Sequence, residues 1–256
     1  VPMRAAEVAD RAGKQPDGSA KTREAKLVTM WTAESRDDEN RPVRDAGSIT
    51  YSAAIESAAA PDTSLDRSDF AERVVRDATR RAFTEAPRSV VLGDGSAWIW
   101  NTASELFPQA IQILDRFHAK QHLSEVGKII YGANSEERKQ WIQQRYDELD
   151  EGRIEPLLQA LNQQAPEYEQ ASKCAEYFRH NRKRVRYPEF HTQGLCTATG
   201  VVEAGCKVAI GTRLKRAGMH WTVSGANAII ALRCSKLSGR YEDFWERRAD
   251  SKKAAA

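Results

Sequence analysis

Two short apolar segments, each ending in an aspartate, constrain the fold of this chain more than any other feature. Residues 89–95 read Ser-Val-Val-Leu-Gly-Asp-Gly, and residues 110–115 read Ala-Ile-Gln-Ile-Leu-Asp. Runs of this length next to turn residues are typical of strands buried in a parallel sheet. Ligands bind outside the carboxyl ends of the strands in open α/β sheets. Both aspartates, Asp94 and Asp115, therefore lie where a functional site is expected.

Helical patterns alternate with these strands. Apolar residues at three- and four-residue spacing predict helices over residues 64–85, 98–106 and 118–130. Two strand-like runs come earlier, at residues 26–31 and 48–51, and we expect them to be neighbouring strands joined by a long acidic loop. The alternation of helices and strands predicts an α/β fold, with a mostly parallel sheet and helices against it.

After residue 132 the apolar spacing is helical and no strand pattern interrupts it. We therefore expect a core at residues 1–132, an all-helical insertion at 133–192, the rest of the core at 193–248 and a disordered tail at 249–256. The third of these segments contains an Ala/Ile-rich stretch that predicts a helix over residues 224–233. A length of 256 residues suits one large domain with one sizeable insertion.

Composition excludes several classes of protein. With 41% hydrophobic and 29% charged residues, the chain is neither collagen-like nor disordered. No apolar run approaches the roughly 20 residues of a membrane span, so we expect no membrane association and a cytoplasmic location. The four cysteines form no Cys-x-x-Cys pair, which argues against a zinc ribbon or a disulfide scaffold. A net charge of +3 permits a nucleic-acid partner without requiring one.

Two carboxylates, Asp94 and Asp115, are candidate metal ligands. A third carboxylate, Glu203, stands beside Ala204 and Gly205, whose small size allows a substrate or backbone to approach, although its local sequence favours a solvent-exposed helix residue. Carboxylate oxygens are the ligands that Mg²⁺ prefers, and two such ions activate a hydroxyl and stabilise the leaving oxygen of a phosphodiester. Simpler interpretations stay open: a Gly-Asp-Gly turn, a helix-capping Asp115 and a solvent-exposed helix Glu203.

A histidine follows the second strand. We expect Asp115 to accept the early N–H groups of the next helix, and His118 to hydrogen-bond back across that turn. His118 and His122 are four residues apart on one helix face, which would suit zinc. The intervening Ala-Lys-Gln lacks the glutamate base of a metalloprotease, so we do not expect a zinc site.

Two basic clusters are candidate phosphate contacts. The first basic cluster comprises Arg179, Arg182, Lys183, Arg184 and Arg186, and the second comprises Lys207, Arg213, Lys215 and Arg216. Each phosphate contact adds a salt-dependent increment to nucleic-acid affinity. Solvated helix faces also carry such charges, and that alternative stays open.

Several blocks of sequence, taken together, resemble one family. They read Leu-Gly-Asp-Gly-Ser-Ala-Trp-Ile-Trp-Asn at 92–101, Gln-Ile-Leu-Asp-Arg-Phe-His-Ala at 112–119, Val-Val-Glu-Ala-Gly-Cys-Lys at 201–207, Gly-Met-His-Trp at 218–221 and Gly-Ala-Asn-Ala-Ile-Ile-Ala-Leu-Arg at 225–233. The chain resembles the ISKra-type insertion-sequence transposases, which are bacterial DDE transposases related to Mutator-like elements. The resemblance runs from residue 1 to about residue 248.

The resemblance implies an RNase H-like mixed sheet flanked by helices, with an all-helical insertion before the helix that carries the last catalytic carboxylate. Asp94 matches the second aspartate of the catalytic triad and Glu203 its glutamate, and both would bind metal. Asp115 and His118 match an Asp-x-x-His signature that supports the site. The implied cofactors are two Mg²⁺ or Mn²⁺ ions, and the implied partners are element-end and target DNA and further copies of the chain.

The sequence departs from the family pattern in two places. The first catalytic aspartate belongs to an Asp-Gly segment expected before the opening Val-Pro-Met, so we expect an N-terminally truncated catalytic domain that is inactive, or nearly so, as this chain. Thr197-Ala198-Thr199 stands where Gly-Ser-Gly is usual. The alternatives are a non-catalytic DNA-binding relic and an RNase H-like nuclease that cleaves without joining strands.

Overall fold

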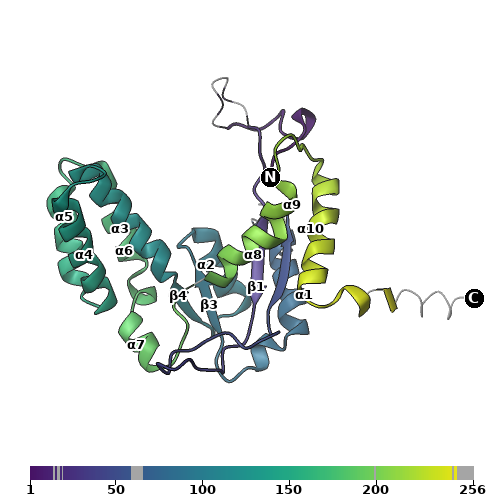
Figure 1. Ribbon diagram of the computed structural model, residues 1–256, viewed down its shortest axis with the longest axis horizontal. Coiled ribbons are helices and arrows are strands. Elements are labelled where there is room, and N and C mark those ends of the chain that lie inside the picture. The colour runs from purple at the N-terminus through teal and green to yellow at the C-terminus, as the bar shows by residue number, and fades with distance from the viewer. Residues whose placement is uncertain are drawn as a thin grey trace, which may run out of the picture. The chain divides into compact units, whose positions relative to one another are not determined.

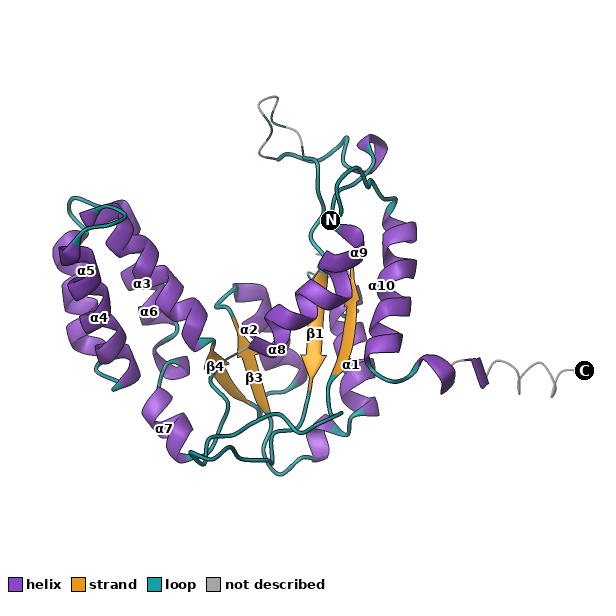
Figure 2. Cartoon of the chain, in the orientation of Figure 1, coloured by secondary structure: helices purple, strands orange, loops and turns teal. Residues whose placement is uncertain are grey.

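The computed structural model describes residues 1–13, 15, 18, 20–58, 66–198, 200–243 and 245–246. The fold is mixed α/β, which confirms the predicted class (Figures 1 and 2). The chain forms two compact units: unit 1 comprises Val1–Glu34, Arg44–Glu85 and the residues from Gly200 onward, and unit 2 comprises Ser35–Val43 and Ala86–Thr199. Each described strand pairs within its own unit. The RNase H-like arrangement and the expected boundaries at residues 132, 192 and 248 stay predictions.

Unit 1 contains an antiparallel pair of strands, β1 (Lys26–Met30) and β2 (Thr50–Ala54), with Lys26 opposite Ala54 and Met30 opposite Thr50. This confirms the prediction that the two strand-like runs are neighbours. A short 3₁₀ turn, η1 (Ala5–Glu7), precedes them.

Helices cover β2 on both of its faces. Because strand side chains alternate between faces, Tyr51, Ala53 and Ile55 enter one core with Ala226 and Ile230 of α10 (Val223–Leu237). On the other face, Thr50 donates to Asp77 of α1 (Asp69–Arg80) at 3.3 Å.

Helix α1 is shorter than the predicted helix over residues 64–85. It begins after Ser68, whose hydroxyl accepts the N–H of Ala71 at 3.1 Å. It ends at Arg80, and a separate 3₁₀ turn, η2 (Phe83–Glu85), follows. The predicted end at residue 85 is wrong because Ala82 has a φ of 48°, which an α-helix cannot contain. Residues 64 and 65 lie outside the described residues.

Side chains of α10 occupy the edge of β2. Asn227 Oδ1 accepts the N–H of Ile55 at 2.7 Å, and Ser238 Oγ accepts the N–H of Tyr51 at 2.9 Å. Unpaired strand edges expose donors and acceptors that invite pairing with other chains. These two side chains satisfy donors that a further strand would otherwise take.

The segment after residue 199 is a helical rod with a π-helix in its middle. It consists of α8 (Gly200–Gly205), η4 (Cys206–Gly211, a π-helix) and α9 (Thr212–Leu214). A Cβ at Gly205 would lie 2.8 Å from Cε1 of Tyr51, so glycine is what allows the rod to approach the sheet this closely.

A side chain from α10 binds the π-helix. The Nε of Arg233 donates to the Ala209 carbonyl at 3.0 Å, and its terminal nitrogen donates to the Val208 carbonyl and to Thr212 Oγ1. π-Helices are rare because their wider turn bonds less favourably. Arg233 therefore stabilises a local conformation that periodicity would not predict.

Unit 2 contains the two strands that end in aspartate. β3 (Val90–Gly93) and β4 (Ile111–Leu114) pair in parallel, with Val90 opposite Ile111 and Gly93 opposite Leu114. The helices α2 (Ala97–Leu106) and α3 (Arg116–Tyr131) follow them. The predicted strand–helix–strand–helix order is confirmed here.

Residues 133–192 of unit 2 form helices joined by short turns, as predicted. They comprise α4 (Glu136–Asp150), α5 (Ile154–Gln164), α6 (Glu169–His180), η3 (Arg182–Arg184) and α7 (Tyr187–Thr192). Helices α3 to α6 lie side by side (Figure 2). Their apolar faces form one core with β3 and β4, and its largest fully buried side chains include Leu157, Leu161, Phe178, Tyr187 and Phe190.

None of the helices in the described ranges is both long enough and apolar enough to cross a membrane. The predicted tail at 249–256 lies outside the described residues.

Candidate functional site

Asp94 stands immediately after β3 with an exposed side chain. Its Oδ1 accepts the backbone N–H of Ser96 at 2.9 Å, which closes a turn of the Asx type. The turn expected from Gly-Asp-Gly is therefore present. No bond to Oδ2 is found within the described part of the chain, so that oxygen is accessible to a ligand.

Tyr177 of α6 contacts the same turn. Its hydroxyl donates to the backbone carbonyl of Asp94 at 2.9 Å. A Cβ at Gly95 would lie 2.4 Å from Cε2 of the Tyr177 ring, and Gly95 has a φ of 97°. Glycine is required here both by the backbone conformation and by the ring. Sequence reasoning missed Tyr177, because a tyrosine at helical spacing resembles any other core aromatic.

Asp115 is buried and caps α3. Its Oδ1 accepts the backbone N–H of His118 at 2.7 Å, which confirms the predicted cap. Its own N–H donates to the Gly93 carbonyl at 2.7 Å, which extends the β3–β4 pairing by one bond. Asp115 thus fixes the start of α3 relative to the end of β3.

Three aromatic rings contact one another beside these aspartates. The rings of His118 and His122 meet edge to face at 5.0 Å between centroids, and those of His122 and Tyr177 lie 4.3 Å apart. We call His118, His122 and Tyr177 the ring cluster. Burial lowers the pKa of His122, and the neighbouring His118 lowers it further, against the opposing effect of Glu125 and Asp94.

Two other side chains of α3 bind a carboxylate of α4. Arg116 and Lys120 of α3 both bind Asp150 of α4, each at 2.6 Å. Burial would raise the pKa of Asp150, but the hydrogen bonds from Arg116 and Lys120 outweigh it and lower that pKa. The two cations are therefore engaged within the protein, where they tie α3 to α4.

Glu203 lies on α8 in unit 1 with an exposed side chain. It makes no hydrogen bond or salt bridge among the described residues, so its carboxylate is available to a ligand. Asp94 and Glu203 belong to different compact units, and their joint action stays a prediction. In the described ranges, no group of three or more His, Cys, Asp or Glu side chains is placed to hold a metal ion.

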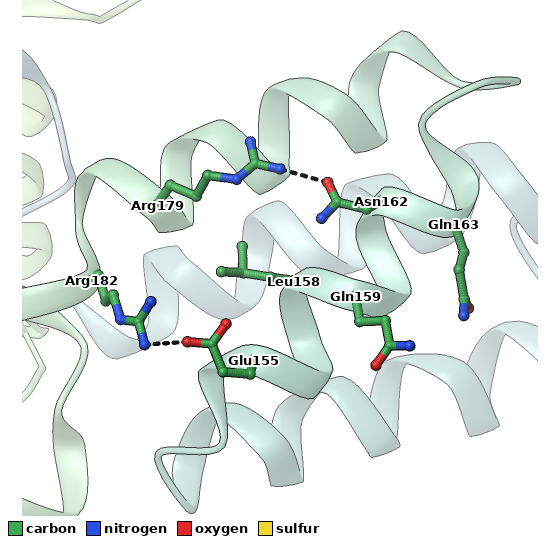
Figure 3. Close-up of a pocket in the computed structure, with 7 residues that line it drawn as sticks. All are labelled: Glu155, Leu158, Gln159, Asn162, Gln163, Arg179 and Arg182. Carbon is green, nitrogen blue, oxygen red and sulfur yellow. Dashed lines mark hydrogen bonds and ion pairs between the residues drawn. The ribbon is translucent and has the colours of Figure 1, made fainter.

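Most of the first basic cluster is paired within the chain. Arg179 binds Glu176 at 3.0 Å and Asn162 at 2.6 Å, and Arg182 binds Glu155. Both arginines line an open hollow of about 640 Å³ between α5 and α6 (Figure 3). The hollow is polar and its cations are neutralised, so it does not resemble an anion site.

The remaining members of the first cluster differ from one another. Arg186 binds Glu189 at 2.7 Å. Arg184 lies over the ring of Trp100 at 4.5 Å and donates to Gln112 at 2.8 Å, and burial lowers its pKa. Lys183 is exposed and, among the described residues, has no acidic partner.

The second basic cluster keeps its charge uncompensated. None of Lys207, Arg213, Lys215 and Arg216 forms a salt bridge within the described part of the chain. Arg213 lies over the Trp221 ring at 5.0 Å, and Arg216 donates to the Thr212 carbonyl at 2.8 Å. Lys207 and Lys215 are exposed. Lys207 and Arg213 lie on the helical rod that also carries Glu203, and Lys215 and Arg216 follow directly after it.

Comparison of the chain with protein-family models, curated proteins and solved structures finds no match.

Proposed function

We propose that this chain is the catalytic domain of a DDE transposase of the ISKra type, with an RNase H-like core. The observation that carries the proposal is the exposed Asp94 carboxylate at the carboxyl end of a strand in a parallel pair, beside the cap formed by Asp115 of the neighbouring strand. Sites in α/β proteins form at this edge. The reaction is cleavage at the ends of an insertion sequence, followed by transfer of the new 3′-hydroxyl to target DNA.

The donor chemistry fits a hard divalent cation. Asp94 Oδ2 and the carboxylate of Glu203 are exposed and unpaired in the described structure, and oxygen is what Mg²⁺ and Mn²⁺ prefer. In the proposed enzyme these two residues hold metal together with the first aspartate that the resemblance implies. When bound, a pair of such ions activates the attacking hydroxyl and stabilises the leaving oxygen.

The other residues of the proposed site act through position and charge. Asp115 and His118 fix the turn between β4 and α3 beside Asp94. The uncompensated cations of the second basic cluster support contacts with DNA phosphates next to Glu203. The proposal includes a homo-oligomer acting on element ends in the cytoplasm of a bacterium.

The test begins with the DNA upstream of the Val1 codon. An in-frame segment that encodes Asp-Gly on a predicted strand completes the triad, and the protein extended by that segment is then assayed for cleavage and joining of labelled element ends with Mg²⁺. Asp94→Asn and Glu203→Gln should each abolish joining while DNA binding is retained. Glu137→Gln, an exposed carboxylate of α4, is the matched control and should keep full activity.

The alternatives give different results. Cleavage without joining identifies a nuclease, because only a transposase uses the 3′-hydroxyl that it makes. Salt-sensitive DNA binding without Mg²⁺, and without any product, identifies a DNA-binding relic. Joining activity in Asp94→Asn at the level of the unmodified protein would contradict the assignment.

A further inference from the structure

We propose that Tyr177, on a helix of the segment 133–192, is a positioning residue that holds the Asp94 turn so that the outer carboxylate oxygen stays open to a divalent cation. This inference rests on the proposed function, because it takes Asp94 as a metal ligand. It gives that helical segment a role in the site that neither the residue pattern nor the resemblance assigned to it.

Two contacts from one side chain fix the turn. The Tyr177 hydroxyl donates to the Asp94 carbonyl at 2.9 Å, and the ring covers Gly95, where it leaves no space for a Cβ. On the other side of the turn, the N–H of Ser96 binds Asp94 Oδ1 at 2.9 Å. The backbone is thus held from α6 and one carboxylate oxygen is held by the turn itself, which leaves Oδ2 as the oxygen that makes no bond among the described residues.

Tyr177 is itself held in place by contacts with neighbouring rings. Its ring packs on His122 at 4.3 Å and edge to face on Phe178 at 5.4 Å. His122 in turn packs on His118, whose N–H is bound by the Asp115 carboxylate. A continuous series of contacts therefore links the aspartate after β4 to the aspartate after β3 through α3 and α6.

Residues that orient metal ligands in this way commonly change metal affinity by about 10- to 100-fold when they are mutated.

The test uses the chain as it exists and Mn²⁺ as the probe. In the unmodified protein, Mn²⁺ should broaden the amide NMR signals of Gly95 and Ser96 selectively, and the concentration at half-broadening is the readout. Tyr177→Phe removes only the hydroxyl and should raise that concentration about 10-fold or more. Tyr168→Phe, at the first turn of the same helix, is the matched control and should leave it unchanged.

Each outcome bears on a different claim. If Asp94→Asn abolishes the broadening and Tyr177→Phe shifts it with an unchanged melting temperature, the inference is supported. If Asp94→Asn abolishes the broadening but Tyr177→Phe behaves like the unmodified chain, the inference alone is overturned. If Mn²⁺ does not broaden Gly95 and Ser96, or if Asp94→Asn leaves the broadening unchanged, the metal assignment in the proposed function fails and the inference fails with it.

Discussion

Two separate constraints, the backbone conformation and a contact with Tyr177, require glycine at position 95. Its φ of 97° and its contact with the Tyr177 ring are separate constraints, and Gly132 has only the first of them, with a φ of 81° and open space where a Cβ would stand. We predict that Gly132→Ala costs about 1–3 kcal/mol from the backbone conformation alone, because a φ of 81° with a ψ of 172° is open essentially to glycine only. Gly95→Ala should cost about 1–3 kcal/mol more, because the new methyl group displaces the ring.

Urea denaturation of both variants measures these costs. Equal losses for Gly95→Ala and Gly132→Ala would show that the Tyr177 ring moves aside freely, and would contradict the tight contact.

His122 should make stability depend on pH. Its pKa is lowered in the folded protein, so the unfolded chain takes up a proton at about pH 6.5 while the folded chain does not until a lower pH. The folded state therefore loses stability as the pH falls below about 6.5, and nothing is lost above it. His122→Gln should reduce the drop in urea midpoint between about pH 7.5 and about pH 5.5.

Exposed His220 supplies the control, since His220→Gln should leave the drop as it is in the unmodified protein. Part of the drop should persist in His122→Gln, because burial also lowers the pKa of His191. A drop of the same size in all three proteins would refute the prediction.

At the residue scale, the sequence predicts the ends of strands better than the contacts around them. Asp94 and Asp115 were found because each ends an apolar run, and the cap on α3 followed from local chemistry. Tyr177 was not found, because the bond that distinguishes it joins residues 83 positions apart. The pairing of Arg182 with Glu155 was missed for a related reason, because net local charge does not reveal which helix faces which. Glu176 and Glu189 each lie three residues from their arginine, and that spacing could have predicted both pairs.

Helix α4 contains two ion pairs with the same spacing and opposite environments. Arg145 and Glu148 are buried, with bonds of 2.6 Å, whereas Glu136 and Lys139 are exposed. We predict that Glu148→Gln lowers the free energy of unfolding by about 3–5 kcal/mol, because it leaves the Arg145 charge buried without its partner. Glu136→Gln should cost less than about 1 kcal/mol.

Denaturant unfolding of the two variants side by side measures the difference. A cost for Glu148→Gln as small as that for Glu136→Gln would mean that water reaches Arg145, in conflict with its burial.

The two basic clusters should contribute differently to DNA binding. The second cluster has no salt bridges to break within the described residues, whereas most of the first is neutralised in the chain. A triple variant of the second cluster combines Lys207→Gln, Lys215→Gln and Arg216→Gln, and a triple variant of the first combines Arg179→Gln, Arg182→Gln and Arg186→Gln. The former should reduce the slope of log K against log salt by about 2–3, and the latter by less.

Binding of each variant to one DNA duplex, measured at several salt concentrations, gives the two slopes to be compared. Equal changes in slope would show that DNA displaces the internal partners of the first cluster.

Among the elements, periodicity predicts those with a regular pattern. The strands β1 to β4, the helices α2 and α3 and the helical character of residues 133–192 follow from apolar spacing. The early end of α1 depends on one positive φ at Ala82, and the π-helix depends on Arg233 reaching it from α10. Neither cause has a local signal in the sequence.

Across the whole molecule, the two units differ in whether their cores come from one stretch of the chain or from distant stretches. Unit 2 takes most of its residues from one continuous stretch, whereas the core of unit 1 joins β2 to residues after position 200, including Ile210, Leu214 and Ile230. We predict that a fragment of residues 86–199 folds alone, with a cooperative thermal transition and helical circular dichroism. A fragment of residues 1–85 should not fold, since it keeps α1 but lacks α10 and the helical rod, which complete the core on the other face of β2.

Circular dichroism melts of the two fragments provide the measurement. A cooperative transition for residues 1–85, or none for residues 86–199, would contradict this division of the cores. The sequence alone could not predict it, because segments that share a core in unit 1 are more than 100 residues apart in the chain.

The π-helix at Cys206–Gly211 affects the direction of Glu203 through the way the rod is wound. A π-helical turn contains more residues than an α-helical turn, so each of its residues turns the chain by less than about 100°, the value for an α-helix. If the same residues were wound as a regular α-helix, every side chain discussed for the site would remain, and yet Glu203 would be rotated relative to Leu214. The winding of this rod, as much as its composition, therefore determines the direction of Glu203.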